Sequence, residues 1–425
     1  MKQFKNFLKE ESKMKQFLKV YLALLLLMTL ALAVSPGSAQ AITAANAQII
    51  NAAQLSYFDG TGTQVKTASV TVTVTLVPSA PTIAVGGPYN TNYSTGAFLD
   101  DTFTITSTAN GPDTYNLSAA TGTQVNNGST GTATVTSGSS VVIGATVTVG
   151  VSTVTAITVP SDGVNDGVVN GIAVGDTVVI GGLARIVASV TDNASGTSTI
   201  NLTVALGTAP SAGVLVAGQK TVTVRVTAGT ITTLGQSVVV PADLTATSNT
   251  DNSKTTTSGY ATNTFFSGLA TLSKYVRNVT TDNHTGGSTA YTFAGNSNVY
   301  YYNLTGTAVN AKPGEVLEYL LVAINSGTGQ VTSAVITDSV PTQYVTFKTG
   351  VYSAKDFQYW PNVVGTPATS FTWTAASTND DPAQYIASAI TVNVGGNPPP
   401  SLPAVGGTIP SNTTVAVIYQ ATVNP

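Results

Sequence analysis

The chain has no cysteine and a single histidine among its 425 residues. The absence of cysteine excludes disulfides, thiolate metal sites and thiol nucleophiles. Because only one histidine is present as well, a zinc site of the usual kind is excluded. Charged residues make up 8% of the sequence, against about 25% in an average soluble protein. A chain so poor in charge is neither a coiled coil nor a charge-rich disordered tail.

Glutamate is scarce, since only Glu315 and Glu318 follow the first 19 residues. Threonine, serine, asparagine, glycine and valine are abundant instead, which predicts an all-β protein. Six of the 16 basic residues and two of the 19 acidic ones lie in those first 19 positions, so ten basic and 17 acidic residues remain, a net charge of −7. No basic patch can be built from that remainder, which excludes nucleic acid and anionic membrane as good partners.

The N-terminal 41 residues have the pattern of a secretory signal peptide. Lys15 and Lys19 precede an apolar stretch over positions 21–34, and the small residues at 38–41 fit a cleavage site. The apolar stretch is shorter than the roughly 20 residues that a membrane span requires. A cleaved signal is therefore favoured over a retained anchor, and it predicts a secreted or cell-surface protein with no membrane span after cleavage.

Residues 42–90 are expected to form an N-terminal β-hairpin followed by a linker. Positions 47–57 alternate in character, the turn falls at 59–62, and Ser69–Val77 alternates Ser/Thr with Val/Leu. The alanines of Ala44–Leu55 make a helix the competing interpretation. The hairpin is favoured because a turn and a partner strand follow at once.

The remainder predicts Ig-like β-sandwiches in series. The first is expected over residues 91–250, with late strands at Lys220–Val226 and Ser237–Thr247 and an edge hairpin beginning near Val214. Five short strands within 151–209 predict a small inserted β-barrel-like subdomain. A Ser/Thr/Asn-rich linker is expected at 251–264, and the second sandwich at 265–425.

The most informative stretch is Lys312–Pro341. A Pro-Gly-Glu turn precedes an apolar strand over Val316–Ile324, an Asn-Ser-Gly turn follows, and Val331–Thr337 alternates into a second strand that ends in Thr-Asp-Ser-Val-Pro. These residues resemble the conserved-repeat surface domains of bacteria and archaea, a family of unknown function. The resemblance implies an Ig-like sandwich and an extracellular setting, and it implies no ligand.

Candidate catalytic and metal-binding residues are few. His284 lies in a turn-like sequence without a nucleophile or acid nearby, which indicates a solvated histidine. Asp100-Asp101, Asp380-Asp381 and the loop 162–167 could offer oxygen ligands to calcium, but Asp and Asn in such places are more often turn formers. Glu315 and Glu318 fall on opposite faces of a strand, so they cannot form a glycosidase pair. The sequence therefore predicts no catalytic, metal or cofactor site.

Aromatic residues gather in one segment, and they could form a sugar-stacking platform or fill the core. They are Tyr352, Phe357, Tyr359, Trp360, Phe371 and Trp373. No cluster of polar side chains accompanies them, which favours the core.

Taken together, these features predict a secreted, non-enzymatic structural or adhesive protein of a cell surface or extracellular matrix, with protein partners that include other copies of itself. The mechanism we consider is β-strand addition by the N-terminal hairpin, with Ile49, Ala53 and Leu55 setting the register. The alternative is a carbohydrate-binding or accessory module of a secreted hydrolase system.

Overall fold

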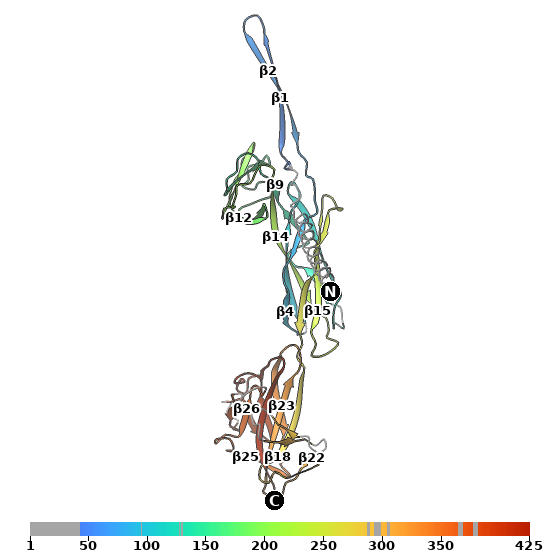
Figure 1. Cartoon of the computed structure of the whole chain (residues 1–425), viewed down its shortest axis with the longest axis vertical. Coiled ribbons are helices and arrows are strands. Elements are labelled where there is room, and N and C mark those ends of the chain that lie inside the picture. Colours follow the sequence, from blue (N-terminus) through green and yellow to red (C-terminus); the bar gives the residue numbers. More distant parts are fainter. Residues whose placement is uncertain are drawn as a thin grey trace, which may run out of the picture.

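The computed structural model describes residues 43–425, apart from 95, 127, 129–130, 287–289, 293–298, 304–306, 364–368 and 377–380. The predicted signal peptide lies outside the described residues. The described chain is all-β, as predicted, and it contains no helix that is long and apolar enough to cross a membrane. The molecule is elongated, with a hairpin at one end and the C-terminal sandwich at the other (Figure 1).

The N-terminal hairpin consists of β1 (Gln48–Phe58) and β2 (Thr63–Thr73). The two strands pair antiparallel without interruption, from Gln48 opposite Thr73 to Phe58 opposite Thr63. The competing helix is therefore wrong, because the turn and the partner strand decide the conformation of this alanine-rich segment. β2 begins and ends earlier than the predicted strand Ser69–Val77. It ends at Thr73 because the backbone from Val74 onward bonds to the base of the hairpin.

The first sandwich packs two sheets around a core that includes Phe103, Tyr115, Val224, Leu244 and Phe265. One sheet contains β3 (Thr82–Val85), β5 (Phe98–Thr106), β7 (Thr132–Val135), β9 (Ala145–Val147) and β14 (Leu215–Thr227). The other contains β4 (Tyr89–Asn92), β6 (Asp113–Thr121), β8 (Ser140–Ile143), β15 (Val238–Ser248), β16 (Thr255–Thr257) and β17 (Ala261–Phe266).

The insertion forms a curled sheet with a core of its own, which includes Ile157, Val178, Val187 and Ile200. Its strands are β10 (Ala156–Pro160), β11 (Thr177–Ile180), β12 (Leu183–Thr191) and β13 (Thr197–Leu202). This sheet continues into the first sandwich through β14, which pairs with β5, β7, β9 and β11. The predicted edge hairpin near Val214 is therefore wrong, because the long Val/Thr alternation supports one central strand that serves both cores.

The segment 251–264 differs from the exposed linker that its composition predicted. It contains β16 and most of β17, and both strands pair with β15. Hydroxyl pairs join Thr245 to Thr257 and Thr247 to Thr255, each at 2.8 Å. Threonine is a favourable strand residue as well as a polar one, so polarity alone could not separate a strand from a linker here.

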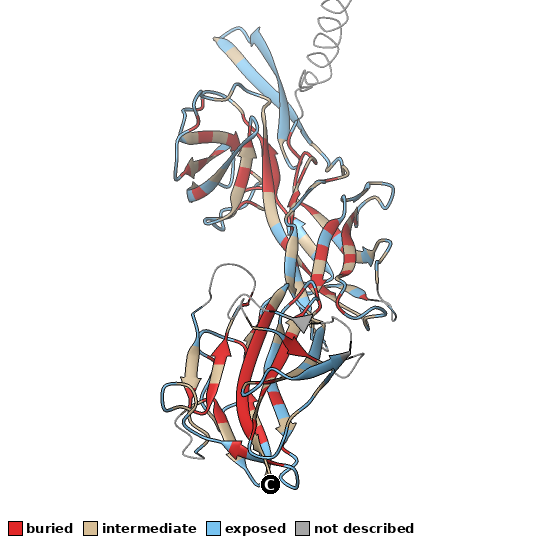
Figure 2. Ribbon diagram, turned by 60° about the horizontal axis from the view of Figure 1, so that its bottom comes forward, coloured by how far each residue is buried: buried red, intermediate tan, exposed pale blue. Residues whose placement is uncertain are grey.

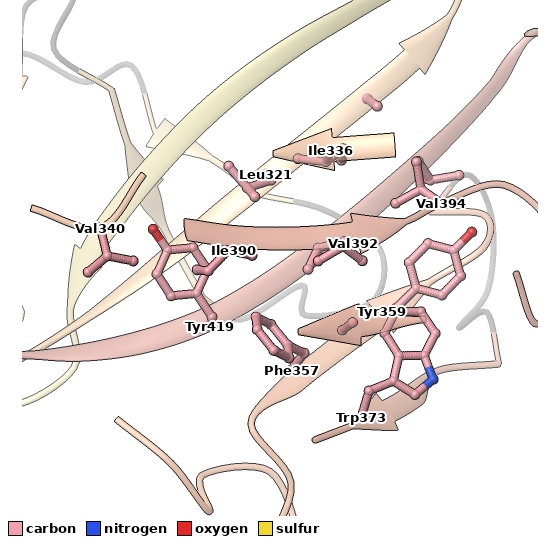
Figure 3. Packing of buried hydrophobic residues seen from close by; sticks show 14 of the residues in the cluster. Leu321, Ile336, Val340, Phe357, Tyr359, Trp373, Ile390, Val392, Val394 and Tyr419 are labelled. Carbon is pink, nitrogen blue, oxygen red and sulfur yellow. The ribbon is translucent and has the colours of Figure 1, made fainter. Parts of the chain in front are cut away.

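The second sandwich packs a large sheet against a smaller one, with Leu321, Phe357, Tyr359, Trp373 and Tyr419 between them (Figure 3). The large sheet contains β18 (Ala270–Asn278), β20 (Ala290–Tyr291), β21 (Tyr301–Tyr302), β23 (Val316–Asn325), β25 (Val345–Lys348), β26 (Phe357–Trp360), β27 (Phe371–Trp373) and β31 (Thr413–Val423). The smaller one contains β24 (Val331–Ser339), β28 (Ala383–Ile386), β29 (Ala389–Asn393) and β30 (Gly407–Ile409), and β19 (His284–Gly286) pairs separately with β22 (Thr307–Val309).

The stretch around Lys312–Pro341 provides one strand to each of these sheets. β23 lies in the large sheet between β18 and β31, and β24 lies in the smaller sheet, so the connection between them crosses the sandwich. Asn325, fully buried, donates to the carbonyls of Gly329, Ile409 and Pro410 and accepts from the backbone N–H of Leu269 and Gly327. One amide therefore fixes the crossing, which explains the Asn at the end of this strand.

Asp101 of β5 is a buried carboxyl group in the first sandwich, so its titration reports on burial there. It is fully buried, accepts a 2.7 Å hydrogen bond from Asn263, and has a second oxygen without a partner in the described chain. Burial raises the pKa of Asp101 to about 6, while the Asn263 hydrogen bond lowers it in part. A carboxyl group whose pKa is higher in the folded state contributes stability at low pH and loses it as the pH rises through about 6.

We predict that Asp101→Asn raises the free energy of unfolding at pH 7.5 by up to about 3 kcal/mol, the energy that corresponds to a pKa rise of this size. At pH 3 the variant and the wild type should unfold alike, because Asp101 is then neutral in both states. Urea unfolding at the two pH values measures this, with Asp282→Asn, at an exposed aspartate, as the surface control. An Asp101→Asn variant that is less stable at pH 7.5 would contradict the burial argument.

Candidate functional site

The N-terminal hairpin is the candidate functional site. Twenty-one of the 22 residues in β1 and β2 are exposed, and Gln64 is intermediate. Figure 2 shows the hairpin in pale blue, extending away from the sandwiches. In the described residues neither strand pairs with anything but the other. Both outer edges therefore present backbone N–H and C=O groups that can accept a further strand.

The two faces of the hairpin differ in character. Residues directly opposite each other in the register share a face, so Leu55 lies with Lys66, and Ser56 with Val65. The apolar face is formed by Ile49, Ala53, Leu55, Tyr57, Ala68, Val70 and Val72, together with Asn51, Gln64 and Lys66. Leu55 and Val70 are 61% and 64% exposed. The opposite face is mostly threonine, serine and glutamine, with Ile50, Ala52, Phe58 and Val65 among them.

A hairpin of this kind is not expected to be stable by itself. Two strands without a third strand or a covering layer are marginal in water. The exposed side chains on the apolar face add a further cost, since large apolar groups are normally removed from water. Both deficits disappear if another protein surface pairs with an edge and covers the apolar face.

Asn110 holds the base of the hairpin. Its side chain accepts from the backbone N–H of Val77 at 2.6 Å and donates to the carbonyls of Thr43 and Thr75 at 2.9 and 3.3 Å. The backbone carbonyl of the same residue accepts from Ala45 at 2.9 Å. Asn110 is 3% exposed. A single buried amide thus joins the segments before β1 and after β2 to the first sandwich.

The turn is organised by Asp59. Its carboxylate accepts from the N–H and hydroxyl of Thr61, at 2.8 and 2.7 Å, and from the N–H of Gly62 at 3.0 Å. Gly60 has φ of 92°, a conformation that favours glycine. The hydrogen bonds from Thr61 and Gly62 lower the pKa of Asp59 to about 2. The hydrogen bonds that define the turn therefore all lie within residues 59–62.

The other sequence candidates do not gather into a site. His284 is exposed on β19 and stacks on Tyr302 with ring centroids 4.2 Å apart. Glu315 and Glu318 have separate partners. The carboxylate of Glu318 accepts hydrogen bonds, at 2.7–2.9 Å, from Arg277, Tyr301, Tyr352 and Gln420. The carboxylate of Glu315 accepts from Asn278 and from the backbone N–H of Lys312. Neither glutamate faces the other across a cleft.

The aspartates considered for calcium bond to protein groups. Asp100 pairs with Arg225, and Asp381 accepts from Thr374 and Ala383. In the loop 162–167, Asp162 and Asp166 accept from backbone N–H groups within or close to the loop. Asp380 lies outside the described residues. In the part of the chain that the structure describes, no group of three or more acidic or histidine side chains is placed to hold a metal ion.

Four of the six aromatic residues considered for sugar stacking are buried in the second sandwich, and Phe371 and Tyr352 are partly buried against its two hydrophobic clusters. Phe357, Tyr359 and Trp373 belong to the core between the sheets, and Trp360 belongs to a second cluster on the outer face of the large sheet. Trp360 and Trp373 are 4% and 5% exposed. The rings therefore form no open platform, and the core interpretation is confirmed.

Comparisons with known proteins give little further information. No family model matches this sequence, and no curated protein matches it. A likeness in structure exists to the C-terminal domain of the AgI/II polypeptide BspA of Streptococcus agalactiae, at 8% identity and a TM-score of 0.31, covering 81% of this chain and 91% of that one. Two further structures, titled BspA_C_WT and BspA_C_mut, give 9% and 10% identity with TM-scores of 0.31 and 0.29, and cover 81% and 82% of this chain and 92% of their own. Nothing about a ligand or a partner follows from so distant a likeness.

We predict that Asn110→Ala loosens the hairpin base. The variant leaves the N–H of Val77 and the carbonyls of Thr43 and Thr75 without their partner, which should cost about 1–3 kcal/mol. Hydrogen exchange of residues 43–47 and 74–77 should become faster, while the core strands β14 and β15 stay protected. Asn116→Ala is the matched control because Asn116 makes only an exposed 3.3 Å bond to Asn249. Equal exchange at the base in both variants would contradict the role of Asn110.

We also predict that Asp59 titrates with a pKa of about 2 in the folded protein. A lowered pKa stabilises the turn at and above the ordinary value of 3.8, and that stability is lost as the pH falls through about 2. The side-chain carboxyl shift and the Thr61 amide shift should follow this transition together in an NMR titration. A pKa near 3.8 would show that the turn is not formed in solution.

Proposed function

We propose that this protein is a secreted, non-enzymatic structural or adhesive component of a cell surface or extracellular matrix, and that it assembles through its N-terminal hairpin. The single observation that carries the proposal is the exposure of both faces and both edges of β1 and β2. The hairpin adds its edge to a sheet of a neighbouring copy and buries its apolar face there. Backbone hydrogen bonds provide the affinity, and the side chains of the apolar face provide the register.

The size of the hairpin supports this role. Eleven residues per strand correspond to a length of about 36 Å. Taking a width of about 10 Å for the pair, the apolar face offers roughly 360 Å². A stable interface needs about 800 Å² from each partner, so the apolar face provides a little under half of that area, and the backbone hydrogen bonds along the edge contribute the remaining affinity.

The charge distribution also supports assembly. Within β1, the turn and β2 the only charged side chains are Asp59 and Lys66, and Asp59 is engaged in its own turn. Charged side chains on exposed strands are a common protection against edge-to-edge association. Their near absence here removes that protection, which is consistent with a hairpin that is meant to associate.

We predict that Leu55→Lys abolishes assembly, because it places a second lysine directly opposite Lys66 on the apolar face, and two like charges would then be buried together in the assembled state. Ser56→Lys is the matched control, since Ser56 is the neighbouring exposed residue on the opposite, polar face. Light scattering and negative-stain electron microscopy of the mature protein measure assembly, and circular dichroism checks that both variants fold. Assembly that is unchanged in Leu55→Lys, or a wild type that stays monomeric at all concentrations, would overturn the proposal.

A further inference from the structure

The smaller sheet of the C-terminal sandwich has an unpaired edge along β24. Val335–Ser339 pairs with β29 on one side and with no other strand in the described residues, while β30 meets β24 only at Val331 and Ala334. The N–H of Val394 donates to Ala334 at 2.9 Å, and the N–H of Val340 donates to Ser388 at 2.8 Å. Even-numbered positions of β24 therefore bond toward β29.

Antiparallel pairing directs the backbone groups of alternate residues to opposite sides of a strand. The N–H and C=O groups of Val335, Thr337 and Ser339 consequently point away from β29, to the side where no described strand lies. All three residues are exposed, whereas Ile336 between them is buried in the core beside Leu321 (Figure 3). The edge of β24 is thus open to a further strand.

Next to this edge, the residues that the structure describes leave part of β18 in the large sheet uncovered. In β18, Leu272, Lys274 and Val276 lie opposite Ala323, Leu321 and Tyr319 of β23, which belong to the core between the two sheets or pack against it. These three side chains of β18 therefore face the smaller sheet. Lys274 reaches across to Asp338 of β24, at 2.6 Å. Leu272 has the same orientation, yet it is 55% exposed, so the described residues leave it largely uncovered.

We propose that the open edge of β24, together with the uncovered face of β18 around Leu272, is the acceptor for the N-terminal hairpin of a second copy of this chain. This inference rests on the proposed function and names the site that receives the hairpin. A strand added beside β24 would pair with Val335, Thr337 and Ser339 and would cover Leu272. It would extend the smaller sheet by one strand, which would lie over the part of the larger sheet around Leu272.

A second copy is the occupant that the structure favours. The hairpin offers an unpaired edge and an apolar face, and the β18–β24 margin lacks both a strand and an apolar cover, so each supplies what the other needs. Hairpin and acceptor lie at opposite ends of the elongated molecule (Figure 1), which prevents a chain from filling its own acceptor. A contact between two different surfaces repeats from one copy to the next and produces a linear fibre when it does not close into a ring.

Two acceptor variants and one exchange measurement test this proposal. Leu272→Lys places a charge under the added strand, and Thr337→Pro removes an outward N–H that the described strands do not use. Both should abolish assembly, while Leu183→Lys, at another exposed leucine on the inserted subdomain, should assemble as the wild type does. In assembled wild type, the amides of Val335, Thr337 and Ser339 should exchange at least about tenfold more slowly than in the Leu55→Lys variant.

The outcomes separate this inference from the proposed function. Normal assembly of Leu272→Lys and Thr337→Pro, with no added protection along β24, overturns β24 as the acceptor while the hairpin remains the donor. Normal assembly of Leu55→Lys overturns the donor and the acceptor together. Circular dichroism and thermal unfolding of each variant identify a folding defect, and the exchange measurement on wild type decides the matter if Thr337→Pro fails to fold.

Discussion

Hydrogen bonding between strands is the interaction on which this structure depends. With no helix in the described chain, almost every backbone group must find its partner in a neighbouring strand, in a turn or in water. Central strands have neighbours on both sides: β31, for example, lies within its sheet between β23 on one side and β25 and β26 on the other. The edge strands of the sheets, among them β1, β2 and the later half of β24, are the places where the molecule can still form backbone hydrogen bonds. The same interaction that builds the sandwiches can therefore join one molecule to the next.

Buried asparagines have the role that disulfides serve in many extracellular proteins. The chain has no cysteine, yet its connections between elements are fixed by buried side-chain amides. Asn110 holds the hairpin base, Asn325 holds the crossing between β23 and β24, and Asn393 bonds the carbonyls of Pro400 and Ala404. An amide can both donate and accept, so one side chain satisfies several backbone groups that no strand reaches. Part of the asparagine content therefore serves the interior of the molecule.

The sequence predicted the all-β class, the hairpin and the Lys312–Pro341 strands because each follows from a local pattern. Alternation marks β1, Asp59-Gly60 marks the turn, and Pro313-Gly314 marks the start of β23. In β16 and β17 the composition predicted a linker wrongly, because Ser and Thr are frequent in strands as well as in linkers. The continuity of β14 was also missed, since a strand's neighbours depend on residues far away in the sequence. The apolar face of the hairpin was visible in the sequence, but its exposure was not.

The proposed acceptor could not be recognised from the sequence at all, and the reason is physical. Leu272 is an apolar residue on the same face of β18 as Lys274 and Val276. Because this face points to the core, the alternation pattern predicts that Leu272 is buried. Only the arrangement of the two sheets leaves it 55% exposed. Whether a strand lies at an edge likewise depends on the whole sheet, because the sequence of β24 would be the same with one neighbouring strand or with two. The molecule therefore has two incomplete surfaces: Leu272 is poorly buried in the C-terminal sandwich, and the hairpin at the other end has no covering layer. Because neither surface can satisfy the other within one chain, the most economical way to bury both is between successive copies.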